Sequence, residues 1–178
     1  MDIVHAAQTG SHDGFLAGYR PSLANAGANG RSVLTGALTN VDPGARLAIA
    51  TRLLDDGADP RATTDGGANT LHALLGNARL DPAAEAPLLR RLLDGGADVN
   101  AVAEGYGTPL QLLVSQFAYT DEALAPFYRV LFARDDLDLL RTGAFARSTY
   151  ATAAGSRRRA ALRARMERYL DARGGTRG

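Results

Sequence analysis

The chain has 178 residues, a formal net charge of +1, and 46% hydrophobic but only 6% aromatic residues. This length fits one domain, and an apolar content made mainly of alanine and leucine favours packed helices over strands. The absence of cysteine and lysine excludes disulfides, thiolate nucleophiles, cysteine-bound metals and a catalytic lysine, while the near-neutral charge argues against binding nucleic acid or membranes over the whole surface.

Residues 1–30 are predicted to form two short helices followed by a turn. Apolar faces at residues 3–7 and 15–19, separated by Gly10, indicate the two helices. The glycine-rich stretch at residues 27–30 does not follow a predicted strand, so we expect a hairpin turn there and not a phosphate-binding loop.

Residues 31–140 repeat one pattern at a spacing of 39. Leu53 and Leu92 lie 39 positions apart, as do Gly57 and Gly96, in the phrases LLDDGADP and LLDGGADVN. Each phrase is typical of a helix that ends at a glycine in the left-handed conformation. Oxygen-bearing side chains at positions 42, 81 and 120 keep the same spacing and are predicted to cap second helices. Short first helices are expected at residues 69–75 and 108–114, so the pattern indicates a solenoid.

The last unit, residues 141–173, is predicted to contain a short first helix and an arginine-rich second helix. Before it, Arg134 and Asp135 replace the glycine of the earlier turns, so that helix end should be less sharply capped. Residues 174–178 are expected to be a frayed tail. The second helix can dock on the preceding unit through an apolar stripe made of Ala161, Leu162, Met166, Tyr169 and Leu170.

The repeated unit resembles the ankyrin repeat, whose first helix carries T-P-L-H-x-A and whose second helix is followed by a glycine-alanine-aspartate turn. Residues 108–110 match T-P-L, residues 71–73 match L-H-A, and residues 57–59 and 96–100 match the turn. The period of 39 exceeds the usual repeat of about 33 residues. The resemblance implies an all-α ankyrin-repeat solenoid in one domain, with about five units at residues 1–30, 31–62, 63–102, 103–140 and 141–173.

Little in the sequence indicates catalysis. His72 lies at the position of the motif histidine, whose ring in ankyrin repeats forms hydrogen bonds with the neighbouring backbone. His5 and His12 are not accompanied by other residues at the spacing of metal ligands, such as H-E-x-x-H. The acid pairs 55–56 and 135–136 fall at helix ends, where solvated turn residues are expected. We therefore predict no enzyme activity, no catalytic residue, no metal site and no cofactor.

In ankyrin repeats function belongs to a surface, because hairpin tips and first helices line up into a concave face that contacts a protein partner. Aromatic residues and arginines on that face are the side chains that most often dominate binding energy. Mapping the motif onto this chain predicts the partner-binding residues Asn29, Arg31, Thr39, Asn40, Asp65, Asn77, Glu104, Tyr106, Ser115, Gln116, Phe145 and Arg147.

The expected partner is a protein, bound by a chain that is a monomer when unbound. The sequence shows neither a signal peptide at its start nor an apolar run near the roughly 18 residues of a membrane span, so we expect a cytoplasmic, bacterial protein. A small protein of this kind is similar to the immunity or inhibitor proteins encoded beside toxins, which gives a narrower hypothesis for the partner.

An alternative function is nucleic-acid binding through the C-terminal arginines. Arginine near a helix C-terminus also complements the helix dipole, and a terminal repeat needs a polar outer face, so capping is the favoured explanation. The alternative basic patch would consist of Arg157, Arg158, Arg159, Arg163, Arg165 and Arg168.

Overall fold

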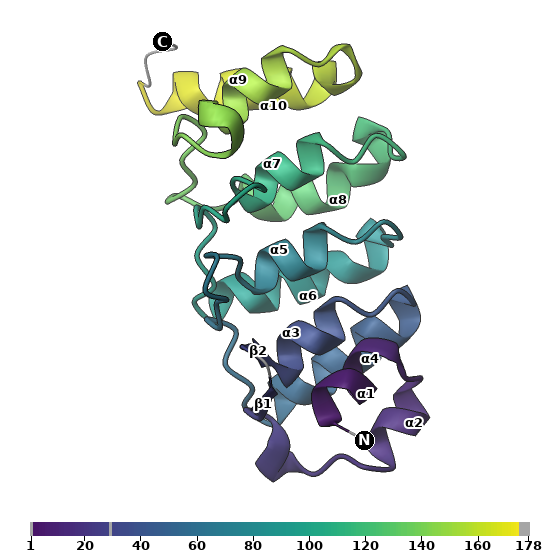
Figure 1. Cartoon of the computed structure of the whole chain (residues 1–178). Helices are drawn as coiled ribbons and strands as arrows, with labels where there is room; N and C mark the ends of the chain where they lie inside the picture. Colours follow the sequence, from purple (N-terminus) through teal and green to yellow (C-terminus); the bar gives the residue numbers. More distant parts are fainter. Residues whose placement is uncertain (1, 29, 175–178) are drawn as a thin grey trace.

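The computed structural model describes residues 2–28 and 30–174, which form a mostly helical, elongated stack (Figure 1). Pairs of helices follow one another along the chain, and short 3-10 turns and one two-stranded hairpin join them. The helices are α1 (Ile3–Thr9), α2 (His12–Leu16), α3 (Val33–Leu38), α4 (Pro43–Asp55), α5 (Thr70–Leu75), α6 (Pro82–Asp94), α7 (Pro109–Val114), α8 (Asp121–Leu131), α9 (Thr149–Ala154) and α10 (Ala160–Ala172). The remaining elements are β1 (Gly27–Ala28), β2 (Arg31–Ser32), η1 (Pro21–Leu23), η2 (Ala144–Ala146) and η3 (Arg157–Arg159).

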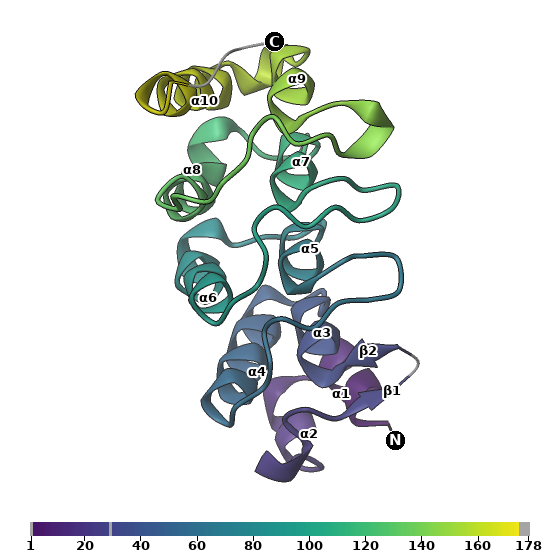
Figure 2. The same cartoon turned by 90° about the vertical axis from the view of Figure 1, so that its left-hand side faces the viewer.

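The helices form two parallel rows, an inner row of α3, α5, α7 and α9 and an outer row of α4, α6, α8 and α10 (Figure 2). Within each row every helix contacts the next one, and α1 and α2 contact α3 and α4 at the N-terminal end. The apolar side chains that face between the rows form one continuous core. Each helix pair therefore buries its apolar surface mainly against its sequence neighbours.

The predicted helix starts are confirmed, because the expected caps make their hydrogen bonds. Asp42 accepts from the backbone N–H groups of residues 44 and 45, Asp81 accepts from residue 84, and Thr120 accepts from residue 123. Asn69 and Thr108 cap α5 and α7 in the same way. A polar side chain at each N-cap satisfies donors that the first helical turn leaves without a partner.

The predicted helix ends also follow from local chemistry. Gly57 and Gly96 take the left-handed conformation, with φ of 87° and 99°, and the next N–H groups reach back to the carbonyls of Leu53 and Leu92 at 2.9 and 3.0 Å. After α8, none of residues 132–137 has a positive φ. The Tyr169 hydroxyl of α10 instead donates to a carbonyl in that turn, that of residue 134, at 2.7 Å.

Hairpin-like connections precede α3, α5, α7 and α9 and extend to the same side of the stack (Figure 2). β1 and β2 pair antiparallel, which agrees with the predicted turn, although residue 29 lies outside the described residues. The next three connections each close with one antiparallel bridge, between residues 63 and 69, 103 and 107, and 142 and 148. Of the predicted tail, residues 175–178 also lie outside the described part of the chain.

Two details of the predicted helices were wrong. α2 ends at Leu16, and Tyr19 instead stacks on Phe15 from the following turn, with ring centroids 4.7 Å apart. Ala161 is exposed, so the buried stripe of α10 consists of Leu162, Met166, Tyr169 and Leu170.

Candidate functional site

The candidate site is the surface made by the hairpin-like connections and the inner-row helices, here called the hairpin face. Tyr106 and Phe145 are its most exposed large apolar side chains, at 62% and 90% exposure. They lie on successive connections, before α7 and α9. The predicted residues that are exposed on this face are Arg31, Asp65, Glu104, Tyr106, Ser115, Phe145 and Arg147.

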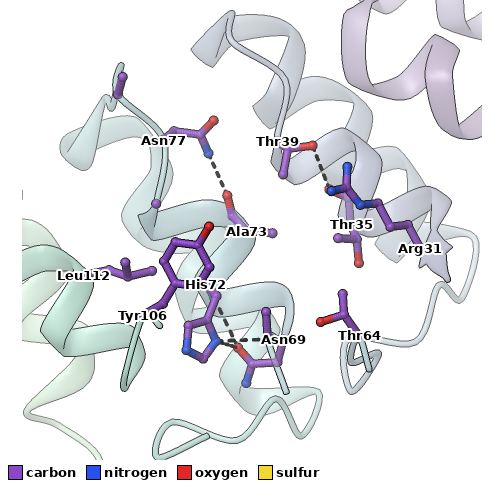
Figure 3. Close-up of a pocket in the computed structure, with 13 residues that line it drawn as sticks. Arg31, Thr35, Thr39, Thr64, Asn69, His72, Ala73, Asn77, Tyr106 and Leu112 are labelled. Carbon is purple, nitrogen blue, oxygen red and sulfur yellow. Dashed lines mark hydrogen bonds between the residues drawn. The ribbon is translucent and has the colours of Figure 1, made fainter. Parts of the chain in front are cut away.

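A first hollow of about 390 Å³ lies on the hairpin face between α3, α5 and α7 (Figure 3). Arg31 and Thr39 line one side of it, while Tyr106 and Leu112 line the other. His72 and Asn69 lie at its base. We call this space the Tyr106 hollow.

A second hollow of about 350 Å³ lies between the connections that precede α7 and α9. Its lining includes Phe145, Arg147 and Ser115, together with Tyr106 and Leu112, which also line the Tyr106 hollow. The ring of Tyr106 is thus shared by both spaces. An aromatic side chain between two depressions is a favourable anchor for a partner surface.

The backbone around Phe145 is unusual. Phe145 and Ala146 both have φ of 55°, the left-handed region that non-glycine residues seldom occupy and that costs about 1–3 kcal/mol per residue. The buried side chain of Gln111 holds this connection, accepting from the Ala144 N–H at 3.1 Å and donating to the Arg147 carbonyl at 2.9 Å. The fold therefore maintains a strained turn that projects an aromatic ring into solvent.

His72 has the structural role that the motif predicted. Its Nε2 lies 2.8 Å from the carbonyl oxygen of Gly107 in the next unit, and its Nδ1 accepts from the backbone N–H of Asn69 at 3.2 Å. Nε2–H therefore donates to Gly107. Burial lowers the pKa of His72, with a smaller opposing effect from the Gly107 bond. Both ring nitrogens are engaged within the protein, which leaves neither for a ligand in the hollow.

Three predicted contact residues instead join neighbouring units. Asn40 is 2% exposed and donates to the carbonyls of residues 7 and 10 at 2.9 and 3.0 Å. The amide of Asn77 donates to the carbonyl of residue 38 at 2.8 Å, and that of Gln116 donates to the carbonyl of residue 75 at 2.9 Å. The prediction of Asn40 as a contact was wrong, because its amide satisfies carbonyls at the end of α1. Asn77 and Gln116 stay partly exposed, as does Thr39, whose hydroxyl donates to the carbonyl of residue 36.

The alternative basic patch loses one member. Arg159 is fully buried, and its guanidinium pairs with Asp121 at 3.2 Å and donates to the carbonyls of residues 114, 116 and 119. The prediction that it contacts phosphate was wrong, since this side chain caps the end of α7 and the loop behind it. The others are less buried, but Arg158 donates to the carbonyl of residue 117 at 3.0 Å, and Arg163 lies 3.8 Å from Glu167. Arg165 lies over the ring of residue 132.

Sequence reasoning missed a second buried arginine. Arg46 of α4 and Glu85 of α6 are both fully buried, with Nε and Oε1 2.5 Å apart. Arg46 also donates to the carbonyls of residues 40 and 79, while Glu85 accepts from the N–H of residue 81. The sequence could have indicated this pair, because an arginine and a glutamate lie 39 positions apart on the apolar faces of two repeats.

The comparisons with known proteins establish a shared fold. No protein-family model matches the sequence, and no curated protein does. The chain is similar to the crystal structure of a functionally unknown protein from Leptotrichia buccalis C-1013-b, with a TM-score of 0.80 and 22% sequence identity. The match covers 98% of this chain and 96% of the other. The two proteins therefore share this helical architecture along nearly their whole length.

Two further features are absent from residues 2–28 and 30–174. No three histidine, aspartate or glutamate residues gather there in a way that could hold a metal ion. Nor does this part of the chain contain a helix with the length and apolar character needed to cross a bilayer.

Proposed function

We propose that the chain is an ankyrin-type solenoid that recognises another protein through its hairpin face, without catalysis. The repeated N-caps and the left-handed glycines after α4 and α6 support the repeat assignment. The bond from His72 to the next hairpin-like connection and the two rows of helices support it further. The glycine turns and the histidine bond are features of the ankyrin motif to which the sequence is similar.

The observation that carries the binding function is the exposure of Tyr106 and Phe145 on successive connections, beside two hollows. Large aromatic rings in solvent add nothing to the core, yet they supply much of the binding energy when a partner buries them. The strained turn at Phe145 adds to this argument, because strain persists where the surrounding structure enforces it and clusters at binding sites.

The test uses a partner isolated with tagged protein from the source organism, identified by mass spectrometry and then purified. Affinity is measured by calorimetry for the double variant Tyr106→Ala/Phe145→Gly. Because glycine tolerates the left-handed conformation, Phe145→Gly removes the ring without adding strain. Loss of two central aromatic contacts should weaken binding at least about a hundredfold.

Phe117→Ala is the matched control. Phe117 is 61% exposed but lies in the connection between α7 and α8, away from the hairpin face. Its removal should leave affinity unchanged. If Phe117→Ala abolishes binding while the double variant binds normally, the partner uses the opposite edge of the stack and the proposal is wrong.

The narrower form of this proposal is an immunity or inhibitor role toward a co-encoded toxin. Its test is to express the products of neighbouring genes alone and with this chain. A product that is toxic alone and harmless in the presence of this chain, but not of the double variant, would support it. If none of the neighbouring products is toxic, the narrower form is rejected and the recognition proposal is unaffected.

A further inference from the structure

The polar groups that line the Tyr106 hollow differ in whether they are free to bind a ligand. Most of the polar groups that line it are already bonded within the protein. His72 is engaged through both ring nitrogens, and Asn69 donates to the carbonyl of residue 98 and accepts from residues 71 and 72. Asn77 donates to three carbonyls, and the hydroxyl of Thr39 to two. These groups therefore contribute shape more than recognition.

Three side chains that line the hollow have no hydrogen bond or ion pair among the described residues, namely those of Arg31, Thr64 and Tyr106. Between them the walls are apolar. They are formed by Ala68, Ala73, Gly76, Ala78 and Leu112. The chemistry available to a ligand is thus an apolar cleft with two hydroxyls and one guanidinium.

Charge decides which ligand fits. Arg31 is the only charged residue in the described lining, and no aspartate or glutamate lines the hollow to neutralise it. A guanidinium binds a carboxylate well because its fixed fork of donors matches the two oxygens. A volume of about 390 Å³ suits a side chain and its neighbour from an extended segment. The same features disfavour a lysine-rich segment, which would meet Arg31 with like charge.

We propose, on the basis of the proposed function, that the Tyr106 hollow receives an apolar side chain of the partner protein whose neighbouring aspartate or glutamate pairs with Arg31. The apolar side chain packs against Tyr106 and Leu112 on one side of the hollow and against Ala73 of α5. The carboxylate reaches Arg31 at the rim on α3's side. The partner segment is therefore acidic and apolar.

The test is an NMR titration of isotope-labelled full-length protein with two blocked peptides, acetyl-Gly-Glu-Leu-Glu-Gly-amide and acetyl-Gly-Lys-Leu-Lys-Gly-amide. The acidic peptide should shift the backbone amide signals of Thr64, Ala73 and Gly76 in a saturable way. The lysine peptide should leave them unchanged at the same concentration. Arg31→Glu should weaken binding of the acidic peptide tenfold or more and should admit the lysine peptide.

Arg90→Glu is the matched control, because Arg90 is an exposed residue of α6 and the change alters net charge equally. It should leave the peptide preference intact. Equal shifts from both peptides, no shift at millimolar concentration, or an acidic preference that survives Arg31→Glu would each overturn the proposal.

Failure here is distinguishable from failure of the proposed function. If the intact partner loses affinity for Tyr106→Ala/Phe145→Gly but binds Arg31→Glu normally, the hairpin face is the binding surface. The proposal that an acidic segment pairs with Arg31 is then wrong. If the partner binds all of these variants normally, the proposed function itself is wrong.

Discussion

His72 joins α5 to the connection that precedes α7, and protonation of its ring should destabilise the fold, because it would place a positive charge in a buried site. Burial lowers the pKa of His72 below its ordinary value of 6.5, so the unfolded chain takes up a proton at higher pH than the folded chain does. The contribution of His72 to the free energy of unfolding is therefore complete above about pH 6.5 and is lost as the pH falls toward the folded-state pKa. The slope from this one proton is at most about 1.4 kcal/mol per pH unit.

Urea unfolding of His72→Gln between about pH 5 and pH 8 measures this effect, because the histidine charge changes in that range. The variant should show a flatter dependence of the free energy of unfolding on pH than the parent chain. His5→Gln/His12→Gln is the control and should keep the parental dependence on the acid side. A variant of His72 that retains the full dependence would contradict the assignment of the slope to this ring.

The role of a single residue could be predicted where a short motif indicates it, and not where it depends only on contacts with another unit. The role of His72 and the turns at Gly57 and Gly96 follow from motifs a few residues long, and they were predicted. Asn40 and Arg159 bond to carbonyls 30 to 45 positions away, so whether they are exposed depends on how the units stack. The motif assigned Asn40 to the contact surface and the C-terminal run of arginines assigned Arg159 to the basic patch, but neither pattern shows that the neighbouring unit covers these side chains. The conformation of Phe145 had no sequence signal, because glycine is the residue expected there.

The buried ion pair between α4 and α6 gives a prediction about what stabilises the packing of these two helices. Arg46→Met leaves Glu85 charged and without its arginine in a fully buried site, which typically costs about 3–5 kcal/mol. The double variant Arg46→Met/Glu85→Met removes both charges, and its free energy of unfolding should return close to that of the parent or exceed it. Chemical denaturation of the two variants measures the difference.

Arg91→Met is the matched control, because Arg91 and Asp55 form an exposed pair, 2.9 Å apart, between the same two helices. Its effect should be much smaller, since solvent screens exposed pairs. If the double variant is as unstable as Arg46→Met alone, the loss comes from packing of the arginine stem, and the ion pair is not what joins the helices.

The elements themselves were largely predictable, since caps, prolines and glycines act within a few residues of each helix end. The 39-residue spacing also placed the paired helices of the middle units. The details that failed, the end of α2 and the exposure of Ala161, lie in the terminal units. There each helix packs on one neighbouring unit only, so the apolar pattern is less complete and constrains the helix less.

Across the whole molecule, stability should be distributed from neighbour to neighbour, because each helix pair contacts mainly the pairs on either side. The side chains of Asn40, Asn77, Gln116 and Arg159 make the same type of bond at successive steps, from one unit to carbonyls of the unit before it. A substitution that removes the bonds between two successive units should therefore destabilise mainly those two units. The junction between residues 103–140 and 141–173 is the best place to test this, because the last unit contacts a neighbouring unit on one side only.

Arg159→Met removes the charged partner of Asp121, which is 7% exposed, and the donor to three carbonyls at the end of α7 and in the next loop. Hydrogen exchange read by mass spectrometry should show faster exchange in α8, α9 and α10, with α1 to α4 unchanged. Arg158→Met, which loses one exposed bond to residue 117, should leave exchange unaltered. Equal acceleration in α1 to α4 would mean that the stack opens as one cooperative unit, and that its units are not coupled only to their neighbours.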